Sequence, residues 1–250
     1  MFTPIGFFAP QGAPPIPVSG YVFHIDLANQ STLTLAGTTI TSLTDVDGLY
    51  TFTNNGIKPQ WNSAGYIDGA ASTAGWGLIE NSNAIAATFG TYPISSNAYT
   101  LVIVTDETPS RSFPFGMRTS TGGTYGNRWD TFYNDSAGRR DIVYGGQTFV
   151  SGITNDVTKD TVIYENIASG NKTIYRWGLS ESSGTGTVGS VNVDADYTKI
   201  GITSRYTNLP TPGFEGKIYT IALYRKTLTS QERQDIKDWA VSKYGLTLQS

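Results

Sequence analysis

The spacing of apolar residues changes from a two-residue to a helical period between residues 217 and 245. Residues 217–224 read KIYTIALY, so apolar residues occupy both sides of a two-residue alternation. A strand of this kind needs packing partners on each of its faces. We therefore expect an inner strand, with residues 218, 220, 222 and 224 on one face and residues 219, 221 and 223 on the other.

The segment that follows predicts a helix over about residues 230–244. Thr229 stands three residues before Glu232, which is the spacing of a capping box. Gly245 stands where a helix commonly ends in a left-handed residue. One helical face is apolar and is expected to pack on the sheet; it comprises Ile236, Trp239, Ala240 and Tyr244.

The chain between residue 20 and this C-terminal segment reads as strands separated by turns. The alternating YVFHIDL (21–27) and the apolar YTLVIV (99–104) predict strands, and Asn55-Gly56 is a strong turn signal. Residues 159–178 predict a hairpin that turns at Ser169-Gly170. Residues 181–192 are rich in Gly and Ser and predict a flexible loop.

Composition narrows the class of protein. The 250 residues can form one large core, and the net charge of -3 argues against a nucleic-acid binder. The chain has no cysteine, and residues 1–20 lack the pattern of a signal peptide, so we expect folding in the cytoplasm. No stretch approaches the roughly 20 apolar residues that span a bilayer.

Residues 1–19, MFTPIGFFAPQGAPPIPVS, form a separate extended arm in which prolines interrupt apolar residues. The apolar side chains must be covered, either by the chain's own domain or by another subunit or a larger particle. In the second interpretation the arm binds a partner through Phe2, Ile5, Phe7 and Phe8.

The C-terminal pattern resembles that of laminin-G-like jelly rolls in the concanavalin A-like lectin/glucanase superfamily. The same resemblance covers HIDLANQSTL (24–33) and TSLTDVDGLYTFT (41–53), where His24 and Leu43 replace the usual Trp. It extends over about residues 20–245 and implies an all-β fold. That fold is a two-sheet antiparallel jelly-roll sandwich over residues 20–250, preceded by the arm and closed by the helix. The matching C-terminal residues are Phe214, Gly216, Ile218, Ile221, Tyr224, Leu228, Thr229, Glu232, Tyr244 and Gly245.

The sequence shows no catalytic constellation. The glucanase branch of this superfamily carries alternating carboxylates on one strand, and the chain has no such triplet. Two acid pairs, Asp45/Asp47 and Asp194/Asp196, either bind a cation or are turn acids that bond their own backbone. His24, the only histidine, is interpreted as a packed or rim residue. We therefore expect a protein that is not an enzyme and has no metal site and no cofactor.

Residues 111–146 are the best candidate for a recognition surface, because they interleave arginines with aromatic residues. Such residues are enriched at protein interfaces, and flat aromatic faces also stack on sugar rings. The alternative is that the aromatic residues are part of the core. The candidate glycan- or partner-binding residues are Arg118, Tyr125, Arg128, Trp129 and Tyr133.

Two functions agree with these observations. The first is a structural and surface-binding module of a bacteriophage virion, as a capsid decoration, head fibre or tail adhesin. It would fold in the host cytoplasm and attach to other virion subunits through the arm, with self-association into a homo-oligomer as one option. The second is a lectin-like carbohydrate-binding module that recognises surface glycans. A degenerate glycoside hydrolase or lyase is a third hypothesis that needs a carboxylate pair across a cleft.

Overall fold

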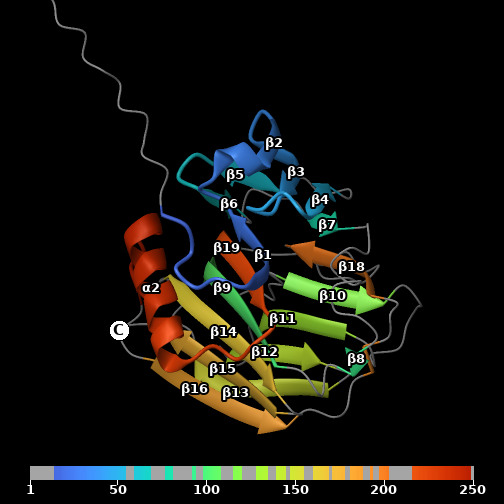
Figure 1. Cartoon of the computed structure of the whole chain (residues 1–250), viewed down its shortest axis with the longest axis vertical. Helices are drawn as coiled ribbons and strands as arrows, with labels where there is room; N and C mark the ends of the chain where they lie inside the picture. The colour runs from blue at the N-terminus through green and yellow to red at the C-terminus, as the bar shows by residue number, and fades with distance from the viewer. Residues whose placement is uncertain are drawn as a thin grey trace, which may run out of the picture.

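The computed structural model describes residues 14–54, 59–68, 77–80, 92–93, 98–107, 115–119, 128–134, 139–144, 147–154, 160–168, 171–177, 181–187, 192–193, 197–202 and 216–248. These residues form a β-protein with one C-terminal α-helix (Figure 1). The strands are β1 (Tyr21–Asp26), β2 (Leu33–Ala36), β3 (Thr39–Thr44), β4 (Thr51–Asn54), β5 (Gln60–Asn62), β6 (Tyr66–Asp68), β7 (Leu78–Glu80), β8 (Tyr92–Pro93), β9 (Tyr99–Glu107), β10 (Phe115–Thr119), β11 (Arg128–Asn134), β12 (Arg139–Tyr144), β13 (Gln147–Thr154), β14 (Thr161–Ala168), β15 (Asn171–Trp177), β16 (Glu181–Thr187), β17 (Asn192–Val193), β18 (Tyr197–Ile202) and β19 (Gly216–Tyr224). The helices are the short 3-10 helix η1 (Gln30–Thr32) and α2 (Ser230–Tyr244).

Two long runs of antiparallel strands make up most of the structure. One run is β1–β19–β9–β14–β15–β16. The other is β7–β18–β10–β11–β12–β13, and it is extended from β7 through β4 and β3 to β2. Strands β5 and β6 connect β3 to β19, so the ladders join into one curled sheet.

Buried aromatic rings connect the two runs. Phe23 of β1 lies 5.9 Å from Phe52 of β4 and 6.1 Å from Phe115 of β10, measured between ring centroids. All three side chains are fully buried. Because Phe23 belongs to the first run and its partners to the second, these contacts form a core between the two runs.

A second core lies between the first run and helix α2. Ile236 and Trp239 of the helix pack with Val102 of β9, Tyr164 of β14 and Tyr224 of β19. Figure 1 shows α2 along this side of the molecule, beside β14. Strand β19 is therefore buried on both faces, as its doubly apolar sequence predicts.

Helix α2 begins and ends at the residues that the sequence predicts. Thr229 and Glu232 form the capping box, with the Thr229 hydroxyl accepting from the Glu232 backbone N–H at 3.2 Å. Gly245 has a φ of 64° and its N–H bonds to the Val241 carbonyl. The predicted helix over about residues 230–244 is confirmed.

An arginine that the helical pattern does not single out also fixes α2 to the sheet. Arg233 is buried and binds Glu181 of β16 through two bonds, Nε to Oε1 at 2.6 Å and Nη2 to Oε2 at 2.9 Å. Its guanidinium lies 3.6 Å from the centre of the Tyr175 ring. The Arg233 carbonyl also accepts a 2.5 Å bond from the Tyr164 hydroxyl.

Two local expectations need correction. The register between β19 and β9 shifts between Ile218 and Thr220, and Tyr219 consequently joins the same cluster as Ala222 and Tyr224. A strict alternation had placed Tyr219 on the opposite face. The Gly- and Ser-rich segment predicted as a loop forms strand β16 over Glu181–Thr187, paired with β15. The hairpin of β14 and β15 is confirmed.

The last residues of the predicted N-terminal arm pack on the chain's own domain. Ile16 and Val18 are buried in the cluster beneath α2. Trp239 donates its indole N–H to the Pro14 carbonyl at 2.8 Å, and Tyr224 donates its hydroxyl to the Val18 carbonyl at 3.0 Å. Residues 1–13, with Phe2, Ile5, Phe7 and Phe8, lie outside the described residues.

The all-β class with a C-terminal helix is thus confirmed, whereas the two-sheet jelly roll and the N-terminal arm stay predictions. In the part of the chain that the structure describes, no helix has the length and apolar character needed to cross a membrane.

Candidate functional site

The predicted recognition residues are only partly covered by the structure. Strand pairing places Arg118 of β10 opposite Arg128 of β11, and Met117 opposite Trp129. Tyr133 lies further along β11, opposite Arg140 of β12. Tyr125 lies outside the described residues, as do the side chains of the other four. Recognition by this group stays a prediction.

The first acid pair behaves as turn residues. The Asp45 carboxylate accepts the backbone N–H groups of Leu49 at 2.7 Å and Tyr50 at 2.8 Å, and burial raises its pKa. Asp47 accepts a 3.2 Å bond from the Tyr21 hydroxyl. Asp194 and Asp196 lie outside the described residues. Among the residues that are described, no group of three acidic or histidine side chains is placed to hold a metal ion.

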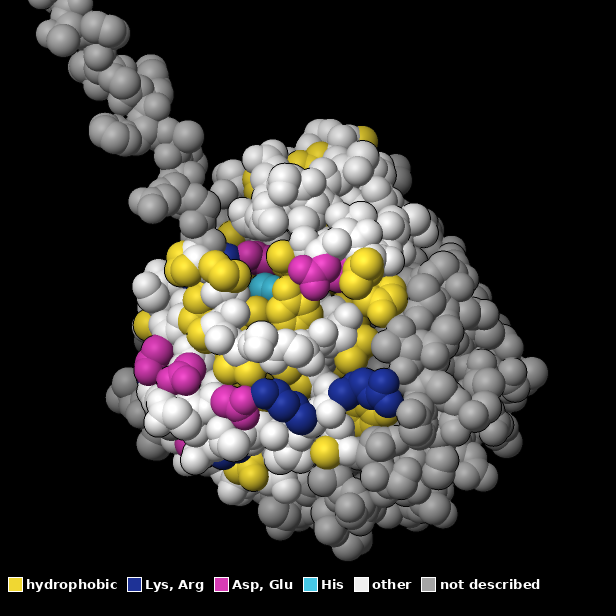
Figure 2. Space-filling model, in the orientation of Figure 1, with side chains coloured by type: hydrophobic (Ala, Val, Ile, Leu, Met, Phe, Trp, Pro, Cys, Tyr) yellow, Lys and Arg dark blue, Asp and Glu magenta, His cyan; other side chains and the backbone are white. Residues whose placement is uncertain are grey.

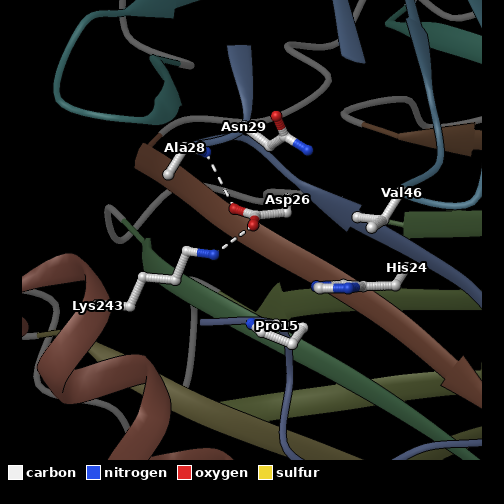
Figure 3. A pocket seen from close by; sticks show the side chains of 7 residues that line it. All are labelled: Pro15, His24, Asp26, Ala28, Asn29, Val46 and Lys243. Carbon is white, nitrogen blue, oxygen red and sulfur yellow. Dashed lines mark hydrogen bonds and ion pairs between the residues drawn. The ribbon is translucent and has the colours of Figure 1, made fainter. Parts of the chain in front are cut away.

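A different site is formed where three distant segments meet. A pocket of about 240 Å³ is lined by residues 15–29, which include β1 and the turn after it, by the turn between β3 and β4, and by the last turn of α2 (Figure 3). The apolar part of its wall is formed by Pro15, Ala28 and Val46. The polar side chains that line it are His24, Asp26, Asn29 and Lys243. Figure 2 shows the only histidine at the floor of a hollow, with acidic and basic side chains beside it.

A buried ion pair fixes one side of the pocket. Lys243 binds Oδ2 of Asp26, and the two side chains are 4% and 7% exposed. Oδ1 of Asp26 accepts the Ala28 backbone N–H at 3.1 Å and the Tyr244 hydroxyl at 2.9 Å. Burial and the neighbouring Asp26 raise the pKa of Tyr244 well above its usual range. The pair is therefore well satisfied and joins β1 to α2.

His24 forms the floor of the pocket and is 1% exposed. Thr220 donates its hydroxyl to the Ile25 carbonyl at 2.6 Å, so its contact with His24 Nε2 at 3.0 Å has the histidine as donor. The neutral ring then carries its proton on Nε2, and Nδ1 is an acceptor. Within the described residues Nδ1 has no hydrogen-bond partner.

The electrostatic environment of His24 favours this neutral form. Burial lowers the pKa of His24 to about 4, which outweighs the opposing effect of the Asp26 charge. Lys243 adds to the lowering, and Asp47 opposes it. The rings of Tyr21 and Trp239 enclose the imidazole at centroid distances of 5.4 and 5.8 Å.

Asn29 stands at the rim of the pocket in the turn after β1. Its Oδ1 accepts a 2.7 Å bond from the Ser31 hydroxyl, and its backbone carbonyl accepts the Thr32 hydroxyl at 2.8 Å. The turn is thereby fixed, while the amide nitrogen of Asn29 bonds to no residue in the described part of the chain. It remains a donor at the edge of the pocket.

Sequence reasoning found only part of this site. It singled out His24 and interpreted it as a packed or rim residue, which the structure confirms. Lys243 and Asn29 were missed. Lys243 lies 217 residues from Asp26, and no local pattern links the two.

No protein-family model and no curated protein sequence matches the chain. Solved structures of Trypanosoma rangeli sialidase are similar to it. The complex described as a covalent intermediate with 2,3-difluorosialic acid is 14% identical with a TM-score of 0.59, covering 97% of this chain and 36% of that one. The complex with sialic acid is 14% identical with a TM-score of 0.60, covering 92% and 34%. A further sialidase structure is 15% identical, with a TM-score of 0.59 and coverage of 91% and 33%.

The likeness shows a shared fold. The chain spans about a third of the length of these sialidases, and it aligns over nearly its whole length. The β-rich, curled antiparallel architecture is common to them. Identity near 14% carries no residue-level correspondence, so no sialidase residue is transferred to this chain.

The prediction that the chain is not an enzyme is contradicted by this comparison. That prediction followed from the lack of a glucanase-type carboxylate motif, but the three similar structures named above are sialidases, which are glycoside hydrolases. Glycosidases of this kind use other catalytic groups than a carboxylate pair. The missing motif therefore does not exclude catalysis.

Proposed function

We propose that this chain is a carbohydrate-binding β-sandwich of the lectin-like type, with the pocket at His24 as its binding site. The observation that carries the proposal is the pocket itself. It combines an apolar wall with polar groups, and one of these, the amide nitrogen of Asn29, bonds to no residue in the described part of the chain. Small-molecule sites are concave, mostly apolar and fitted with a few such polar groups.

Two further points support a sugar as the ligand. A volume of about 240 Å³ is below the roughly 300 Å³ at which pockets for drug-sized ligands begin, so it suits one ring. The chains with a similar fold were solved with sialic acid and a derivative of it.

The finer fold assignment, a two-sheet laminin-G-like jelly roll, is part of this proposal. Its support is the arrangement of β-ladders in two long runs with a phenylalanine core between them. A second observation that supports this assignment is that α2 packs against the first run of strands.

A glycan array probed with the folded full chain tests the proposal. We expect a restricted set of glycans to bind above background, and we expect free monosaccharide to compete with them. An array without binding, obtained with protein whose melting transition shows it to be folded, would overturn carbohydrate binding as the function.

The virion hypothesis is a second proposal and is compatible with the first, since a virion adhesin can bind glycans. Its support is that residues 14–18 are fixed to the domain, by the bond from Trp239 to the Pro14 carbonyl and by the burial of Ile16 and Val18, so the chain before residue 14 starts from a fixed point. The test compares how well the full chain and a chain that lacks residues 1–13 assemble with virion proteins. Equal assembly by both would remove the anchoring role of Phe2, Ile5, Phe7 and Phe8.

A further inference from the structure

Residues 14–18, which we call the strap, are the least firmly held wall of the His24 pocket. They belong to no strand or helix. Their backbone carbonyls accept side-chain bonds from Trp239 and Tyr224, and the side chains of Ile16 and Val18 are buried. By contrast, β1 is fixed by its ladder with β19, and α2 by its buried ion pair with β1. The strap is therefore the wall that can open with the fewest broken contacts.

The strap and the helix residue that binds it cover His24. Pro15 lines the pocket that has His24 as its floor, and Figure 3 shows both side chains at this pocket. The Trp239 ring that holds Pro14 lies 5.8 Å from the imidazole, measured between centroids. The imidazole is 1% exposed, and within the described residues its Nδ1 has no hydrogen-bond partner. A proton added at Nδ1 therefore needs an acceptor, and water reaches this atom only when a wall of the pocket moves.

We propose that protonation of His24 releases the strap, so that mild acid detaches residues 14–18 while the sheet and α2 stay folded. Once the strap has left, water accepts the proton of Nδ1 and solvates the charged ring. Release also takes Pro15 out of the pocket wall and frees the point to which residues 1–13 are joined. The inference goes beyond glycan binding, because it assigns to the N-terminal segment an attachment that pH controls.

The groups around His24 set the direction of the effect. Burial lowers the pKa of His24 to about 4, with a contribution from Lys243, and outweighs the two nearby acids that raise it. The nearby tyrosines have raised pKa values and stay neutral from pH 5 to pH 7, whereas the raised pKa of Asp45 makes this acid a competing trigger. β19 contributes an uncharged threonine, and the strap has no titratable group. The titratable groups are Tyr21 and Asp26 on β1, Asp45 and Asp47 in the turn between β3 and β4, and Lys243 and Tyr244 on α2.

The size of the effect follows from the two states of the imidazole. An open strap exposes the ring, which then titrates with its ordinary pKa near 6.5. Between this value and about 4, the open state binds the proton and the closed state does not. The closed strap is therefore fully favoured above pH 6.5 and loses this preference as the pH falls toward 4. The ratio of open to closed strap is expected to rise about twentyfold from pH 7 to pH 5.

Thiol labelling measures the opening, because the chain has no cysteine of its own. In the full chain, Ile16→Cys places a single thiol in the strap at a position that is 6% exposed. A dilute pyridyl disulfide, which modifies thiols at both pH 5 and pH 7, reacts with it only while the strap is open. Leu49→Cys, at a position that is 68% exposed, gives the rate of an open thiol at each pH, and the ratio of the two rates is the open fraction. Val102→Cys, at a fully buried position of β9, reports unfolding of the whole domain in the same way.

The expected result has two parts. The open fraction at Ile16→Cys rises about twentyfold from pH 7 to pH 5, and it exceeds the open fraction at Val102→Cys at both pH values. With His24→Phe added, the open fraction at Ile16→Cys is the same at both pH values, because phenylalanine cannot titrate. His24→Gln is a second variant that cannot titrate, and its amide nitrogen can still donate to Thr220, so it is expected to behave in the same way.

Three results would overturn the proposal. An open fraction at Ile16→Cys that does not change with pH would show that the strap opens without uncovering His24. Equal open fractions at Ile16→Cys and Val102→Cys would show that the strap leaves only when the whole domain unfolds. A rise that persists in both His24 variants would assign the trigger to another group, with Asp45 as the first candidate. None of these measurements involves a glycan, so their outcome is independent of the proposed function.

Discussion

The buried neutral state of His24 predicts that the fold loses stability in mild acid. In the unfolded chain His24 titrates with a pKa near 6.5, and in the folded chain with a pKa of about 4. Between these values the unfolded state binds the proton and the folded state does not. Stability from this group is therefore complete above pH 6.5 and is lost as the pH falls toward 4.

The magnitude follows from the same two pKa values. Linkage gives a loss of about 1.8 kcal/mol in the free energy of unfolding between pH 7 and pH 5, and about 3.4 kcal/mol at full protonation. The side chain is 1% exposed, so solvent screening does not reduce the effect. The charged groups that face His24 act in both directions, with Lys243 lowering its pKa and Asp26 and Asp47 raising it.

The assay is urea unfolding, followed by tryptophan fluorescence at pH 7 and pH 5, for the unmodified chain and for His24→Phe. The phenylalanine retains a ring between Tyr21 and Trp239 but cannot titrate. It loses the bond to Thr220, so we expect it to be less stable by about 1 kcal/mol at pH 7. Asp45, whose pKa is raised, titrates in both proteins and cancels in the comparison.

The expected result is that His24→Phe loses about 1.8 kcal/mol less than the unmodified chain between the two pH values, so that their stabilities cross. An equal loss in both proteins would show that His24 is not held neutral, and the electrostatic description of the pocket floor would be wrong.

Three further predictions concern the elements around the pocket. Arg233→Met leaves Glu181 without its partner and should lower the free energy of unfolding by about 2–3 kcal/mol in urea, against less than about 0.5 kcal/mol for the exposed control Gln231→Ala. A chain that starts at residue 20 lacks buried Ile16 and Val18 and should be less stable, by about 3 kcal/mol or more, than a chain that starts at residue 14; equal melting of the two would contradict the packing seen beneath α2. Gly65→Ala should cost about 1–2 kcal/mol in thermal unfolding, because φ is +87° and a Cβ would lie 2.9 Å from Ala28, while Gly37→Ala, with open space around it, should cost less.

The features that sequence reasoning predicted well are those fixed by neighbouring residues. The capping box of Thr229 and Glu232, the stop at Gly245 and the hairpin turn after Ala168 each depend on a few consecutive positions. The burial of β19 on both faces could also be predicted from the sequence, because a strand with an apolar residue at nearly every position needs contacts on both faces.

The features that were missed depend on partners distant in sequence. The register shift beside Tyr219 exists only in the ladder with β9, and strand β16 forms despite its Gly and Ser content because β15 pairs with its backbone. Arg233 reads as a polar helix position until Glu181 and Tyr175 are placed beside it. The pocket needs three segments at once, and their proximity is a result of the topology.

The pocket combines groups that the fold uses with groups that it leaves free. Asp26 has three protein partners, and Lys243 is held by Asp26, so both are fixed in place by the contacts that join β1 to α2. His24 is fixed through Nε2 and Asn29 through its oxygen, and the amide nitrogen of Asn29 is the polar atom at the rim that no described residue engages. Rigid support together with a free polar atom favours binding, because a ligand then forms its hydrogen bond without ordering the side chain first.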